Sequence, residues 1–176
     1  MRVITGTARG CRLETLAGEA TRPTTDKVKE AIFSAIQFDL PYKKVLDLFA
    51  GSGQLGIEAL SRGASSCVFV DQNKKAVEII RRNLQTTRLA DKAQVATTDA
   101  LGFLSRTNEK FDVVFLDPPY ASSLLLSALN ACADKLNNGG FIICESDDGT
   151  ELPETIGTLS VHRTYQYGRI HITIYR

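Results

Sequence analysis

Two short motifs contain the residues most able to do chemistry. The first, Asp47-Leu48-Phe49-Ala50-Gly51-Ser52-Gly53, joins an apolar run to a helical pattern. The second, Asp117-Pro118-Pro119-Tyr120, follows Phe111–Leu116, the most apolar run in the chain. Each motif brings an acidic side chain to the end of an expected strand, where ligands bind in open α/β sheets.

The glycine-rich motif indicates a ligand that lies against bare backbone. Gly51 and Gly53 permit a sharp reversal with positive φ. With Gly56 they also match the G-x-G-x-x-G spacing of dinucleotide-binding proteins, which is a weak signal alone. Asp47, however, would repel a pyrophosphate at this point, and its carboxylate instead favours a ligand with a positive centre.

Acidic residues also follow the next two expected strands. Asp71 comes 24 residues after Asp47 and could accept hydrogen bonds from two ribose hydroxyls. Asp99 follows the third expected strand, where its carboxylate could accept a hydrogen bond from an adenine amino group. Carboxylates at three neighbouring strand ends favour S-adenosylmethionine over NAD, although each Asp alone could be a cap or turn residue. The expected cofactor contacts are Asp47, Phe49, Ala50, Gly51, Gly53, Asp71, Gln72, Asp99 and Ala100.

The Asp-Pro-Pro-Tyr motif favours chemistry on an exocyclic base amine. Such an amine is a poor nucleophile because its lone pair is delocalised into the ring. Acceptors that hold both N–H protons can free that lone pair, and Asp117 and the carbonyl of Pro118 are suitable. Pro119 stiffens the turn and Tyr120 can stack on the base. We expect these four residues to form the reaction site, with positioning in place of a strong general base.

The elements around these motifs predict an α/β fold. Expected strands at 45–49, 67–70, 93–97, 111–116 and 141–144 alternate with helices at 54–62, 76–84, 100–105 and 124–136. Apolar strands between helices are typical of a parallel sheet covered on both faces. At the end of the chain, 159–167 and 170–175 predict an antiparallel hairpin. A helix is expected from about 24 to 36, and a turn-rich hairpin over 2–16.

Composition predicts a single soluble domain of 176 residues. No apolar run reaches the roughly 20 residues of a membrane span, and no apolar signal core begins the sequence, so we expect a cytoplasmic protein. Four cysteines without C-x-x-C spacing and two histidines make a metal site improbable.

The net charge of +1 hides basic ends: residues 1–44 and 155–176 each carry +3, and the middle carries −5. Basic ends favour a polyanionic partner.

The whole chain resembles the RsmD-type small-subunit ribosomal RNA guanine-N2 methyltransferases. The resemblance lies in both motifs, in the segment Thr21–Glu30 with Arg22-Pro23-Thr24, in Arg9-Gly10 and in Tyr167-Gly168. It implies a Rossmann-like, seven-stranded, mostly parallel methyltransferase sheet with an antiparallel C-terminal hairpin and an N-terminal β-hairpin. Residues 1–22 would be the hairpin extension, and 23–176 the methyltransferase domain.

The resemblance also implies an activity and a partner. A methyl group would pass from S-adenosylmethionine to N2 of a guanine in ribosomal RNA, within an assembling small subunit. Nothing in the residues themselves suggests an obligate dimer, so we expect a monomer. The family usually has further glycine and arginine residues in the hairpin, where this chain has Thr5 and Cys11. Residues expected to contact RNA phosphates are Arg9, Arg12, Arg22, Lys27 and Lys29, together with the tail hairpin.

Two other functions remain open from the residues alone. The Asp-Pro-Pro-Tyr motif is also common in DNA methyltransferases that act on adenine N6 or cytosine N4, but we see no separate target-recognition domain. A non-catalytic RNA-binding assembly factor could keep the same fold. The intact acidic residues at three strand ends argue against lost cofactor binding.

Overall fold

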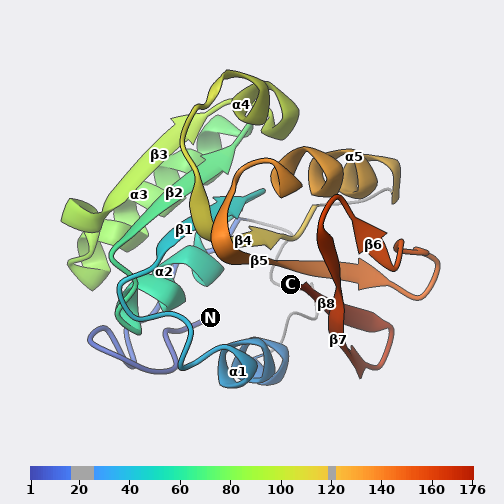
Figure 1. Ribbon diagram of the computed structural model, residues 1–176. Coiled ribbons are helices and arrows are strands. Elements are labelled where there is room, and N and C mark those ends of the chain that lie inside the picture. Colours follow the sequence, from blue (N-terminus) through green and yellow to red (C-terminus); the bar gives the residue numbers. More distant parts are fainter. Residues whose placement is uncertain (17–25, 119–121) are drawn as a thin grey trace.

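A computed structural model of the protein describes residues 1–16, 26–118 and 122–176 (Figure 1). Within these residues the strands form one sheet in the order β3-β2-β1-β4-β5-β8-β7-β6. Strands β1 to β5 are parallel, and β8, β7 and β6 continue the sheet antiparallel. The strands are β1 (Lys44–Leu48), β2 (Ser66–Asp71), β3 (Ala93–Thr97), β4 (Phe111–Leu116), β5 (Leu136–Asp147), β6 (Thr155–Ile156), β7 (Leu159–Tyr167) and β8 (Ile170–Tyr175).

Helices cover both faces of the sheet, as its apolar strands require. They are α1 (Asp26–Ala35), α2 (Gln54–Ser61), α3 (Lys74–Thr87), α4 (Ala100–Arg106) and α5 (Ser122–Ala133), with a short 3₁₀ turn, η2 (Ala90–Lys92). Helices α1, α2 and α3 pack in one core with one face, and α4 and α5 pack in a second core with the other. Figure 1 shows this layering, with α4 and α5 above the sheet and α1 and α2 below it.

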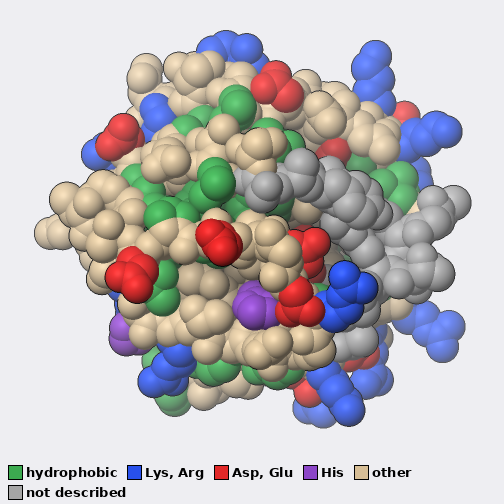
Figure 2. Space-filling model, turned by 90° about the vertical axis from the view of Figure 1, so that its right-hand side faces the viewer, with side chains coloured by type: hydrophobic (Ala, Val, Ile, Leu, Met, Phe, Trp, Pro, Cys, Tyr) green, Lys and Arg blue, Asp and Glu red, His purple; other side chains and the backbone are tan. Residues whose placement is uncertain are grey.

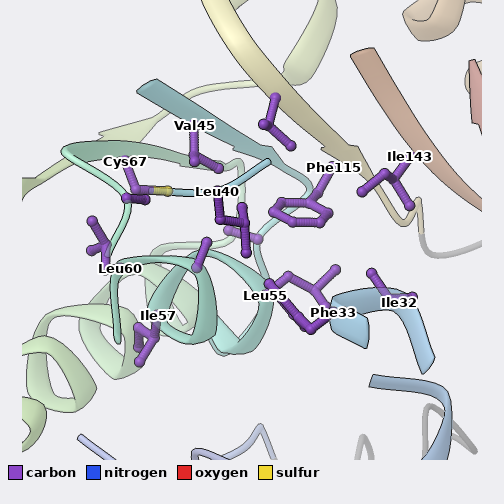
Figure 3. Close-up of a cluster of buried hydrophobic side chains, with 14 of the residues drawn as sticks. Ile32, Phe33, Leu40, Val45, Leu55, Ile57, Leu60, Cys67, Phe115 and Ile143 are labelled. Atoms are coloured by element: carbon purple, nitrogen blue, oxygen red, sulfur yellow. The ribbon is translucent and has the colours of Figure 1, made fainter. Parts of the chain in front are cut away.

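The α/β class and the antiparallel C-terminal hairpin are confirmed, and β6 adds an eighth strand of two residues to the seven expected. The core beneath the sheet joins α1 to the central strands: the ring of Phe33 lies 5.6 Å from that of Phe115, and Ile143 packs beside them (Figure 3). Because β1 and β4 are covered on both faces, most of their residues are apolar on both sides of the strand, with Asp47 in β1 and Asp112 in β4 as acidic exceptions.

One expected boundary is wrong. The sequence predicted a helix that continues to 136 and stops near Asn137–Gly140, but α5 ends at Ala133 and β5 begins at Leu136. The β4–β5 register shifts between Phe111 and Val113, so Leu136 pairs with Phe111 before the exposed residues 137–139. Because the first residues of β5 are mostly exposed, the sequence there has no continuous apolar run that would predict a strand.

The N-terminal hairpin is present as one antiparallel bridge, Arg2 to Arg12. Its backbone also bonds to helix α2. The N–H groups of Ile4 and Thr5 donate to the carboxylate of Glu58 at 2.8 and 3.0 Å, and the N–H of Ala8 donates to Ser61 Oγ at 2.9 Å. Val3, Ala8 and Leu13 enter the same core as α1 and α2, so residues 1–16 pack against the sheet domain.

Neither a membrane-spanning helix nor a cluster of metal-ligating side chains occurs among the described residues. No helix in 26–118 or 122–176 is long and apolar enough to cross a membrane. No group of three His, Cys, Asp or Glu side chains among the residues described could hold a metal ion.

Candidate cofactor and active site

The site is built at the carboxyl edge of the parallel strands. Asp47, on β1, is buried, and its Oδ2 accepts a hydrogen bond of 2.8 Å from the N–H of Gly56. Burial raises the pKa of Asp47 to about 8; Asp117 and Asp71 raise it too, and the Gly56 hydrogen bond opposes them. A cationic ligand would favour the ionised carboxylate, because opposite charge lowers the pKa of an acid.

The turn after β1 needs its glycines for two reasons. Gly51 and Gly53 have φ of 54° and 78°, in the left-handed region that glycine adopts without a Cβ clash. Gly56 lets α2 approach β2, since a Cβ there would lie 2.3 Å from Phe69 Cε1 and 2.7 Å from Cys67 Sγ. The sequence therefore serves both the ligand-facing turn and the helix–sheet packing behind it.

The other two carboxylates are held by backbone N–H groups. Asp71, at the end of β2, accepts from the N–H of Gly51 at Oδ2 and from that of Asn73 at Oδ1, both at 2.8 Å. Asp99 caps α4 by accepting from the N–H of Gly102 at 2.7 Å. An ionised carboxylate has about four acceptor positions. Each Asp is thus a cap or turn residue and can still accept from a ligand.

All three carboxylates line one cavity of about 320 Å³. Asp117, which follows β4, lines it too, so the two motifs share one site rather than separate cavities. Eight of the nine expected cofactor contacts are in its wall; Gly53 is the exception. The described wall consists of Met1, Leu16, Asp47, Phe49, Ala50, Gly51, Ser52, Gln54, Leu55, Val70, Asp71, Gln72, Asn73, Thr98, Asp99, Ala100, Leu101, Asp117 and Leu124.

Sequence reasoning missed several of these wall residues. Ser52, Gln54, Asn73 and Thr98 adjoin the turns that the motifs identified, so their position beside the glycines and acidic residues could have revealed them. Met1 gave no such signal. It reaches the cavity because the N-terminal segment folds over the turn, where Ser52 Oγ lies 3.8 Å from Met1 Sδ as a weak donor.

The second motif is described only in part. Asp117 lines the cavity, and Pro118 follows it without lining the wall. Pro119 and Tyr120 lie outside the described residues. The expected roles of these two residues therefore stay predictions.

The expected RNA contacts divide into two groups. Arg9 and Arg12 in the N-terminal segment and Lys27 on α1 are exposed. None of these three forms an ion pair with another described residue. They could therefore meet phosphates. Arg22 lies outside the described residues.

Lys29 was expected to contact RNA, and the structure places it in the interior instead. Its side chain is 1% exposed, its Nζ lies 3.6 Å from Glu58 Oε2, and it donates to the carbonyl of Arg2 at 2.5 Å. Burial lowers the pKa of Lys29, and Glu58 and Asp26 oppose that shift. Lys29 falls on the inner face of α1, so the ammonium fixes the N-terminal segment rather than reaching a phosphate.

The cavity wall fits S-adenosylmethionine better than a phosphate-bearing cofactor. The described wall contains four Asp residues and no Lys, Arg or His. A pyrophosphate would meet several carboxylates and no basic side chain in the described wall, whereas a sulfonium, an ammonium, a ribose diol and an adenine amine all suit carboxylate acceptors.

Comparison with known proteins decides the family. The model of the family described as "Conserved hypothetical protein 95" matches residues 1–176. Ribosomal RNA small subunit methyltransferase D of Escherichia coli K12 is 33% identical over 178 residues, covering 100% of this chain and 89% of its own length. The chain belongs to the RsmD family.

Further relatives agree with this membership. The YlbH protein of Bacillus subtilis is 45% identical over 181 residues, covering 100% of this chain and 98% of its own length. The solved structure of yhhF from Escherichia coli superposes with a TM-score of 0.90 at 34% identity, covering 99% of this chain and 96% of that chain. The family resemblance in the sequence motifs is confirmed over the full length.

Proposed function

We propose that the protein transfers a methyl group from S-adenosylmethionine to the exocyclic N2 amine of a guanine in small-subunit ribosomal RNA. One observation carries the proposal: Asp47, Asp71, Asp99 and Asp117 line one cavity whose described wall contains no basic side chain. Relatives named ribosomal RNA small subunit methyltransferase D, at 33% and 36% identity, support the substrate class.

The cofactor would lie across the ends of β3, β2 and β1. Asp99 would accept from the adenine amine and Asp71 from the ribose hydroxyls, through the positions that Gly102, Gly51 and Asn73 leave open. Asp47 would face the positively charged end. Phe49, Ala50, Gly51, Gln72 and Ala100 complete the wall around it, and Gly53 shapes the turn.

The protein's part in the reaction is to hold the target amine. S-adenosylmethionine, when bound, would supply an activated methyl group, whose S–C bond would break as the N–C bond to the amine forms. Asp117 and the carbonyl of Pro118 would accept the two N–H groups and direct the lone pair toward the cavity. Pro119 would keep this turn stiff, and Tyr120 would stack on the guanine. The methylated ammonium is acidic and loses its proton without a strong base.

The RNA would meet the N-terminal side of the molecule. Arg9, Arg12 and Lys27 offer exposed cations there, and we keep Arg22 as a proposed contact. The tail hairpin is less suited. Figure 2 shows acidic side chains near the centre of the face over the C-terminal strands and basic ones mostly at its margin. On that hairpin Arg169 lies 3.9 Å from Asp148.

A small protein with few RNA contacts would gain others from its substrate particle. We therefore propose that it acts as a monomer on RNA in an assembling small subunit. Such a substrate would place the protein in the cytoplasm.

Labelled S-adenosylmethionine tests the proposal when it is supplied with small-subunit particles from a strain that lacks this gene, with naked ribosomal RNA and with DNA. Nucleoside analysis should find the label in N2-methylguanosine from the particles. Asp117→Ala should lower the rate at least a hundredfold at a temperature where the variant is fully folded, whereas Asp91→Ala, in exposed η2 at the amino end of β3, should have no effect. Label in adenine or cytosine of DNA would overturn the proposal in favour of a DNA methyltransferase.

A further inference from the structure

Asn83 is a polar residue on the buried face of α3. The other buried residues of this helix are mostly apolar, and Asn83 is only 1% exposed. Asparagine is a poor helix former, because its amide competes for backbone hydrogen bonds. A buried amide also costs stability unless it is hydrogen-bonded. Tertiary hydrogen bonds must therefore offset both costs.

The Asn83 amide bonds the backbone of two segments that lie far apart in the sequence. Its Oδ1 accepts from the N–H of Glu14 at 2.8 Å, and its Nδ2 donates to the carbonyl of Glu14 at 3.0 Å. The same Nδ2 donates to the carbonyl of Ser52 at 2.9 Å, so both amide protons and the oxygen are engaged. One side chain thus joins the N-terminal segment, residues 1–16, to the glycine-rich turn after β1.

Each of the two joined segments contributes to a binding surface. The glycine-rich turn is part of the cavity wall, and Met1 and Leu16, at the two ends of the N-terminal segment, line the same cavity. Between these ends the segment carries the exposed Arg9 and Arg12, which are proposed phosphate contacts. A ligand in the cavity and an RNA on the segment would therefore both stabilise the docked state, in which the segment lies against the turn.

We propose that Asn83 is a positioning residue that couples cofactor binding to RNA binding by holding the N-terminal segment against the cofactor turn. The inference rests on the proposed function and adds a residue outside both motifs. Two ligands that favour the same docked state raise each other's affinity reciprocally. When fewer molecules are docked, the affinity for each ligand falls in proportion. Asn83 keeps the docked fraction high before either ligand arrives.

Asn83→Ala tests this role, because it removes the amide from both segments. At a temperature where the variant is fully folded, it should bind S-adenosylhomocysteine, the demethylated cofactor, about tenfold more weakly than the wild type if about one molecule in ten stays docked. Affinity for small-subunit particles from a strain that lacks this gene should fall by about the same factor. Saturating S-adenosylhomocysteine should restore the particle affinity to within about threefold of the wild type, which loss of a purely structural residue would not allow.

Thr87→Val is the matched control. Thr87 is buried on the same helix, and its hydroxyl bonds the carbonyls of Asn83 and Leu84 within α3. This variant should melt at a lower temperature and keep both affinities. Hydrogen exchange of the wild type gives a second measurement that needs no variant: S-adenosylhomocysteine should slow the exchange of amides in residues 1–16 and leave that of residues 159–167 unchanged.

The role of Asn83 is wrong, while the proposed function stands, if Asn83→Ala binds S-adenosylhomocysteine and the particles like the wild type. It is wrong too if saturating S-adenosylhomocysteine restores none of a lost particle affinity. Equal exchange in residues 1–16 with and without the ligand overturns the coupling even if Asn83→Ala misfolds. If the wild type does not bind S-adenosylhomocysteine, the proposed function fails and the coupling fails with it.

Discussion

Replacing Glu58 by glutamine tests whether the buried charges around it hold the N-terminal segment in place. Glu58 is fully buried, and four donors surround its carboxylate: the N–H groups of Ile4 and Thr5, Arg62 Nε at 2.8 Å and Lys29 Nζ at 3.6 Å. The substitution removes the negative charge and leaves the Lys29 ammonium buried, with the carbonyl of Arg2 as its hydrogen-bond acceptor.

The expected loss is large. Breaking a buried ion pair by removing one partner costs about 3–5 kcal/mol, because the other charge is left uncompensated. For a domain of this size each kcal/mol lowers the melting temperature by about 2–4 °C, which gives a decrease of roughly 6–20 °C. The double variant Glu58→Gln/Lys29→Met should recover part of this loss, since the Lys29 ammonium is then removed as well and only Arg62 remains without the carboxylate.

Thermal melting of the wild type, both single variants and the double variant measures this coupling. In parallel, the salt dependence of RNA binding is compared between Lys29→Met and the wild type, because the slope changes only if Lys29 contacts a phosphate. A phosphate contact contributes roughly 0.7–0.9 to the slope of log K against log salt. A stabilising role for the buried Glu58–Lys29 pair is refuted if Glu58→Gln melts within 2 °C of the wild type. It is refuted equally if Lys29→Met melts like the wild type and lowers the slope of log K against log salt.

Three further outcomes are expected. The pKa of Asp47 is raised to about 8, so its protonated form stabilises the folded protein; this stabilisation is complete below about pH 4 and is lost as the pH rises through 8. Because a cationic ligand favours the ionised carboxylate, binding of S-adenosylmethionine at pH 7 should release protons in calorimetry, and Asp47→Asn should abolish that release. Gly56→Ala should destabilise the protein by about 3 kcal/mol in urea melts, because its Cβ overlaps Phe69, and unchanged stability would contradict the packing. Arg12→Ala should reduce the salt slope of RNA binding by about 0.7–0.9 while the protein melts normally; an unaltered slope excludes Arg12 from the interface.

The sheet could be predicted because its strands are short apolar runs with turn signals at their ends. Strands β3 and β4 begin and end where the pattern indicated, and Asp47, Asp71 and Asp117 meet at one edge because parallel strands end there together. The limits of α5 and β5 could not be predicted, since the pairing of Phe111 with Leu136 depends on a register shift that leaves no periodic signal.

Two features of the structure are not encoded by the local sequence. In the sequence, Lys29 looks like a surface residue on a short amphipathic helix. Only its tertiary contact with Glu58, 29 residues later in the chain, shows that it is buried. Met1 likewise enters the cavity through folding of a segment 51 residues away from Ser52. Both depend on tertiary contacts, whereas the glycine turn and its acidic neighbours depend on adjacent residues.

Titration of the purified protein with S-adenosylmethionine shows whether the acidic residues at successive strand ends surround one cofactor. We expect one binding site per chain and at least a tenfold loss of affinity in Asp71→Ala, whose carboxylate would hold the ribose. Absence of binding heat in the wild type, or an Asp71→Ala variant that binds as tightly as the wild type, would contradict this expectation.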